Sequence, residues 1–84
     1  MIERRKNMIF EKIVELICEQ FEVEPKSITE DTNFLQDLSA DSLDFVELVM
    51  NIEDCFGLPE ISEDEIRTIQ TVGDLVEYVA KTQN

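Results

Sequence analysis

Ser42 is the side chain whose type and position best suit covalent chemistry in this sequence. It follows Asp41 inside a long run of residues that contains neither Gly nor Pro. A catalytic serine needs a neighbouring base, and the sequence contains no His to act as one. A lone Ser at this position is typical of a helix start, and it is also well placed to be modified by another enzyme. If a helix begins here, its positive end would favour an attached phosphate.

Metal and disulfide chemistry are not predicted. Cys18 and Cys55 lie far apart in the chain and, without any His, form no zinc-binding motif. We expect both to be reduced thiols packed in or near the core, which favours a cytoplasmic protein. An EF-hand calcium loop starting at Asp31 would need Gly at its sixth position and Glu at its twelfth. The sequence has Gln36 and Ser42 at those positions, so no calcium site is expected.

Acidic residues dominate the charge of the chain. Its 84 residues include 20 Asp and Glu against 7 Lys and Arg, a net charge of −13 at pH 7. Between Lys26 and Arg67 there are twelve acidic residues and no basic one. Such a chain would be repelled by nucleic acid and by anionic membranes, and no signal peptide or membrane span is expected. A basic protein surface is the partner that suits it.

The segments that position these residues are predicted to be helices. Apolar residues recur at helical spacing over residues 6–21, 42–56 and 71–81, and a short helix is expected over 62–67. Residues 22–40 form a long connection rich in turn-forming residues. No segment alternates in the manner of a strand. The sequence predicts a single small all-α domain, a four-helix bundle with three longer helices and one short helix.

Local signals mark the ends of the predicted helices. Asp41 suits the N-cap of the second helix, and Gly57 suits its end. Ser62 and Glu65 have the spacing of a capping box at the start of the short helix. Five apolar residues are expected to pin the long connection to the core: Val23, Ile28, Phe34, Leu35 and Leu38.

The second helix has two apolar stripes, although a helix on the outside of a small bundle needs only one. At about 100° per residue, one arc is the predicted core face. It contains Phe45, Leu48, Val49, Ile52, Cys55 and Phe56. The opposite arc contains Leu43, Val46 and Met50, together with Glu47 and Asp54, and is flanked by Glu53. Scattered surface apolar residues are normal, but apolar residues ringed by carboxylates favour a docking site for a basic partner.

Residues 34–50, FLQDLSADSLDFVELVM, resemble the signature of acyl carrier proteins. They are most similar to the free-standing bacterial type of fatty-acid synthesis. The resemblance continues through Glu53, Asp54 and Phe56 to the last predicted helix, and it covers about residues 8–82.

This resemblance implies a four-helix bundle in which Ser42 carries 4′-phosphopantetheine, installed from coenzyme A by a separate phosphopantetheinyl transferase. The thiol of that arm would hold acyl groups as thioesters, sheltered by the bundle and presented to fatty-acid synthesis enzymes and acyltransferases with basic docking patches. The protein itself would be a monomeric cytoplasmic carrier and not an enzyme. The docking positions implied by the family are Asp41, Leu43, Asp44, Val46, Glu47, Met50, Glu53 and Asp54.

Several positions depart from the usual pattern of the family. The stretch from Gly57 to Ser62 is one residue longer than usual, and Ser62 replaces a frequent Pro. Ser39 stands where Gly is usual, Phe45 where a smaller residue is usual, and Ile66 where Ala is common. Phe45 and Ile66 are expected to change the volume of the acyl cavity.

Two alternatives remain open from the sequence. The first is a specialised carrier of the same fold, either a D-alanyl carrier for teichoic acids or a discrete carrier of polyketide or peptide synthesis. The run from Val46 to Met50 favours the fatty-acid type. The second alternative is an interaction module whose Ser42 is unmodified or phosphorylated.

Overall fold

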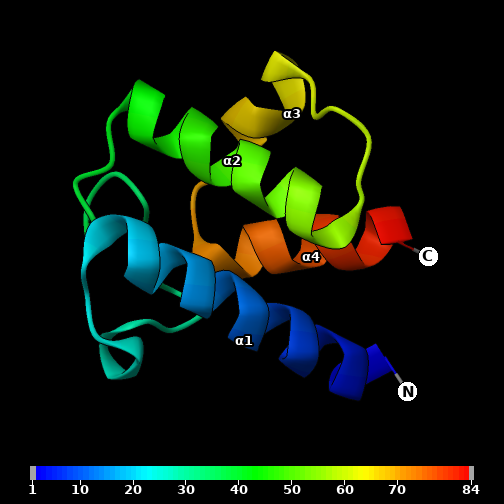
Figure 1. Ribbon diagram of the computed structural model, residues 1–84, viewed down its shortest axis with the longest axis horizontal. Coiled ribbons are helices and arrows are strands. Elements are labelled where there is room, and N and C mark those ends of the chain that lie inside the picture. Colours follow the sequence, from blue (N-terminus) through cyan, green and yellow to red (C-terminus); the bar gives the residue numbers. More distant parts are fainter. Residues whose placement is uncertain (1, 84) are drawn as a thin grey trace.

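The computed structural model describes the backbone of residues 2–83 and the side chains of residues 6–83. Its helical elements are α1 (Ile2–Phe21), the 3₁₀ turn η1 (Pro25–Ser27), α2 (Ser42–Phe56), α3 (Glu63–Thr68) and α4 (Val72–Gln83). Helix α1 packs along both α2 and α4, and the long connection closes one end of the bundle (Figure 1). No strand forms among the described residues. The predicted all-α four-helix bundle, with three longer helices and one short helix, is confirmed.

Helix α1 begins at Ile2, earlier than the predicted start near residue 6. The additional residues are mostly charged, so they carry no apolar periodicity, but Glu and Arg are good helix formers. Within the described part of the chain, no helix combines the length and the apolar character needed to cross a membrane.

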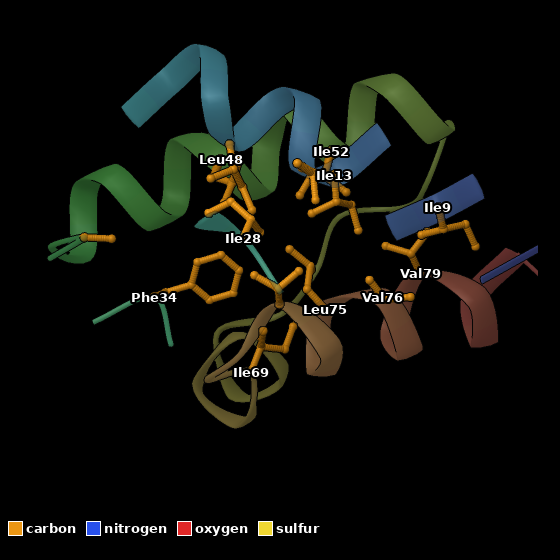
Figure 2. Packing of buried hydrophobic residues seen from close by; sticks show 14 of the residues in the cluster. Ile9, Ile13, Ile28, Phe34, Leu48, Ile52, Ile69, Leu75, Val76 and Val79 are labelled. Atoms are coloured by element: carbon orange, nitrogen blue, oxygen red, sulfur yellow. The ribbon is translucent and has the colours of Figure 1, made fainter. Parts of the chain in front are cut away.

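The core forms where α1, α2 and α4 face one another. Figure 2 shows apolar side chains from these helices, and from the long connection, pointing into one cluster. Each aliphatic side chain that is fully buried stabilises the fold by about 1.5–3 kcal/mol. The largest fully buried side chains are Ile13, Ile17, Leu48, Ile52, Leu75, Val49, Val72, Val76 and Val79.

Both cysteines are free thiols. Cys18 is half-buried on α1, and desolvation raises the pKa of its thiol. Cys55 is exposed on α2, so the prediction that it packs on the core face is wrong. The predicted arc is wide, and whether a residue is buried depends on whether another segment covers it. No segment covers Cys55, whereas Leu48, Val49 and Ile52 of the same arc are buried.

Backbone hydrogen bonds join the long connection to the start of α4. The Val72 N–H donates to the Thr32 carbonyl at 2.9 Å, and the Gly73 N–H donates to the Glu30 carbonyl at 2.8 Å. These bonds satisfy two of the N–H groups that the first turn of a helix leaves without internal partners. The approach is close, because a Cβ on Gly73 would lie 3.0 Å from the Glu30 carbonyl oxygen. The long connection is therefore fixed to the bundle.

Four of the five apolar residues predicted to pin this connection do turn towards the core. Ile28 and Phe34 are buried, and Val23 and Leu38 are half-buried against the core cluster. Leu35 is 70% exposed, so the prediction is wrong there. Residues 34–37 form a turn, which directs Phe34 inward and its neighbour outward.

The predicted ends of α2 and α3 are confirmed. Asp41 caps α2 by accepting a 2.8 Å hydrogen bond from the Asp44 N–H, and Gly57 ends it in the left-handed conformation, at φ 64°. Ser62 and Glu65 form the capping box of α3. The hydrogen bond from the Ser62 hydroxyl stabilises the charged carboxylate and so lowers the pKa of Glu65.

Candidate functional site

Ser42 is the first residue of α2, and its side chain is exposed. The N-cap position is occupied by Asp41, whose carboxylate binds the Asp44 N–H. The Ser42 hydroxyl makes no hydrogen bond with any residue that the structure describes. It is therefore accessible to a modifying enzyme, at the helix end that favours negative charge.

A groove of about 610 Å³ lies beside Ser42, between the long connection, α2 and α3. Ala40, Phe45, Ile66 and Ile69 contribute apolar surface to it. The ring of Phe45 packs on that of Phe34, with centroids 5.0 Å apart and planes tilted by 51°. Phe45, which the sequence assigned to the core face of α2, is half-buried and lines this groove.

The second apolar stripe of α2 is exposed, as the helical spacing predicted. Leu43 is 68% exposed, Val46 40% and Met50 57%. Carboxylates accompany this stripe. Two exposed ones, Glu47 and Asp54, lie on α2, and a third, Asp41, lies at its N-cap, while Asp44 in the first turn is half-buried. The structure thus presents apolar side chains among carboxylates on one accessible surface. We call Leu43, Val46, Met50 and Glu47 the outer face of α2.

Glu53 has a structural contact that the sequence did not reveal. Its carboxylate accepts a 2.7 Å hydrogen bond from the Ile61 N–H, and its side chain is half-buried. It therefore ties the end of α2 to the segment before α3. At the other end of α2, the Gln20 side-chain amide donates to the Asp44 carbonyl at 2.7 Å. These two contacts fix the direction of the helix that presents Ser42.

Sequence reasoning missed two residues near Ser42. Leu35, expected in the core, is exposed and lines the groove. Arg67 was assigned no role, yet it lines the same groove from α3. The available signal was its position as the first basic residue after Lys26. Among the residues described, no cluster of three Cys, Asp or Glu could hold a metal ion.

Comparison with known proteins identifies the family. Residues 11–79 match the family described as phosphopantetheine attachment site. An acyl carrier protein from Lactobacillus johnsonii is 53% identical over 76 residues, which cover 90% of this chain and 94% of that protein. Another, from Lactobacillus acidophilus, is 53% identical over 75 residues, covering 89% of this chain and 92% of that protein. A third, from Wolinella succinogenes, is 48% identical over 71 residues, covering 84% and 92%.

Solved structures have the same fold. The acyl carrier protein from Enterococcus faecalis superposes with a TM-score of 0.77 at 34% identity, covering 92% of this chain and 96% of that one. The acyl carrier protein from Thermotoga maritima superposes with a TM-score of 0.79 at 33% identity, covering 94% of this chain and 91% of that one.

The residues around the start of α2 fit a covalently attached phosphopantetheine. An accessible hydroxyl is present at Ser42, the helix end favours the phosphate, and the groove offers space beside it. The matched family and the relatives cover most of the chain, including this region. The chain belongs to the acyl carrier protein family, and it is a carrier of acyl groups on 4′-phosphopantetheine rather than an enzyme.

Proposed function

We propose that Ser42 is the residue that carries 4′-phosphopantetheine, and that the protein delivers acyl thioesters to the enzymes of fatty-acid synthesis and to acyltransferases. The observation that supports this assignment is the exposed Ser42 hydroxyl, which makes no hydrogen bond to any residue described and stands at the start of α2 beside a groove.

Ser42 needs help from another protein to react. The chain contains no His, and the carboxylate of the adjacent Asp41 is engaged in capping α2. A phosphopantetheinyl transferase must therefore take up the hydroxyl proton. The Ser42 oxygen then forms a bond to the phosphorus of the pantetheine half of coenzyme A, and the bond to the nucleotide half breaks. The arm, once attached, supplies the thiol that holds acyl groups.

The groove is a suitable place to shelter the part of an acyl chain nearest the arm. Its apolar surface comes from the connection, α2 and α3, next to the attachment point. Phe45 and Ile66 both line the groove, so these two departures from the family pattern set its size.

The outer face of α2 is the surface we assign to docking, together with Asp41, Asp44, Glu53 and Asp54. Exposed apolar side chains give contact, while the carboxylates steer a basic partner and allow fast exchange. Glu53 contributes mainly through its hydrogen bond to Ile61, which orients the helix.

We further propose that the protein acts as a monomer in the cytoplasm. Its net charge of −13 opposes self-association, and its two cysteines are free thiols. Nothing in the comparisons favours the D-alanyl, polyketide or peptide-synthesis carrier, because the relatives are named acyl carrier proteins.

Intact mass spectrometry tests the assignment of Ser42. The protein is incubated with coenzyme A, Mg²⁺ and a broad-specificity phosphopantetheinyl transferase. Wild type should gain one phosphopantetheine and Ser42→Ala none, with unchanged helical circular dichroism because the helix cap is Asp41. Ser27→Ala, which changes another exposed serine far along the chain, should still be loaded. Loading of Ser42→Ala, or no loading of folded wild type, would refute the assignment.

A further inference from the structure

Arg67 occupies an unusual electrostatic position. It lies in the last turn of α3, its side chain is exposed, and it lines the same groove as Ser42. The other charged residues that line this groove in the described structure are Asp41 and Glu63, both acidic. Arg67 is therefore the positive charge of a groove that is otherwise negative.

The guanidinium of Arg67 forms no ion pair within 4.0 Å with any described residue. The two ion pairs found among these residues are Lys6–Glu77 and Lys12–Glu15. The Asp41 carboxylate is directed to the Asp44 N–H. Glu63 lies four residues before Arg67 on the same helix, a spacing at which the two side chains attract each other only weakly. Arg67 is thus available to bind an anion brought into the groove.

We propose that Arg67 binds the phosphodiester attached to Ser42, which holds the first part of the arm in the groove between α2 and α3. This inference rests on the proposed attachment at Ser42. The planar guanidinium offers paired N–H donors to two phosphate oxygens, and the start of α2 contributes further positive potential. Arg67 is in this respect a positioning residue and takes no part in the chemistry of loading.

The contact has a consequence for docking. An anionic arm is attracted by Arg67 in the groove and repelled by Glu47 on the outer face, so it is kept on the α3 side of Ser42. Val46 borders the groove, but Leu43, Glu47 and Met50 of the outer face do not line it and stay uncovered for partner enzymes. The contact also links two helices, since α3 has only six residues, none of them buried. Loading should therefore stabilise the protein through Arg67.

The test compares unloaded and loaded forms of wild type, Arg67→Gln, Arg67→Lys and Lys26→Gln. Lys26→Gln is the matched control, because it removes one exposed positive charge from η1, outside the groove. At low salt, loading should raise the Tm of wild type and Lys26→Gln by about 4 °C more than that of Arg67→Gln, as expected for one exposed charge pair.

The ³¹P resonance of the loaded protein is the second measurement. In loaded Arg67→Gln it should shift from its wild-type position, and in Arg67→Lys it should lie between the two. High salt should reduce both the Tm difference and the ³¹P shift.

Two outcomes would overturn the inference. One is a ³¹P resonance in loaded Arg67→Gln identical to that of wild type. The other is a Tm change that is the same in unloaded and loaded Arg67→Gln, which would mean that Arg67 only offsets the acidic residues of the groove. If the proposed attachment at Ser42 is itself wrong, the result differs from both of these outcomes, because wild type would then gain no mass on incubation with the transferase.

Discussion

The two apolar faces of α2 are built from similar residues and differ in what covers them. Leu48 and Ile52 are buried in the core cluster with side chains of α1, α4 and the long connection, and Val49 is buried as well. Leu43 and Met50, on the outer face, are largely exposed. One face therefore contributes to folding, and we assign the other to binding. This difference in exposure supports the interpretation that the second apolar stripe of α2 binds a partner and does not enlarge the core.

The largest difference between the two faces should appear in stability. Leu48→Ala removes a fully buried side chain and leaves a cavity, so the free energy of unfolding should fall by about 3 kcal/mol. Leu43→Ala, the same change on the outer face, should alter it by less than about 0.5 kcal/mol. Urea denaturation followed by circular dichroism measures both. Equal effects would mean that the two faces are not distinct.

Charge on the outer face should control docking. Glu47→Lys places a positive charge where a basic partner is expected, so affinity for the phosphopantetheinyl transferase should fall about tenfold at low salt. High salt should shrink this loss through screening. Surface plasmon resonance at the two salt concentrations is the measurement. Glu11→Lys, the same reversal at an exposed site on α1, serves as the control, and an equal loss there would refute a localised docking face.

The apolar part of the outer face should have a smaller effect. Met50→Ala should weaken transferase binding about fivefold, or about 1 kcal/mol, while leaving the free energy of unfolding nearly unchanged. Isothermal titration calorimetry measures the affinity. Met8→Ala is a matched control, because Met8 is also exposed but lies on α1. If Met8→Ala weakened binding as much as Met50→Ala, the docking surface would have to extend to α1.

The smallest expected effect belongs to Ser39, which lies in neither face. Its backbone is in the left-handed region, at φ 52°, where a side chain is strained and glycine is not. Ser39→Gly should raise the free energy of unfolding by about 0.5 kcal/mol, measured by urea denaturation. Ser39→Ala, which keeps a Cβ, should bring no such gain. Transferase affinity should be unaffected by either change, since Ser39 contributes to neither face of α2.

The sequence predicted much of this structure because the signals involved are local. Helical periodicity located α2 and α4 to within about two residues. Asp41, Gly57 and the pair Ser62 and Glu65 marked helix ends, since each cap is made within a few residues along the chain. The exposed stripe of α2 also followed from spacing alone, because residues on one side of a helix share their surroundings.

Tertiary structure decided the features that depend on distant segments. Cys55 lies in the predicted core arc but is exposed, because no other helix covers it in the described part of the chain. Leu35 is exposed because a turn directs its neighbour Phe34 inward. The groove likewise brings Arg67 of α3 and Ser42 of α2 together across a separation of 25 positions. Periodicity tells which residues share a face, but burial and proximity depend on what the rest of the chain packs against that face.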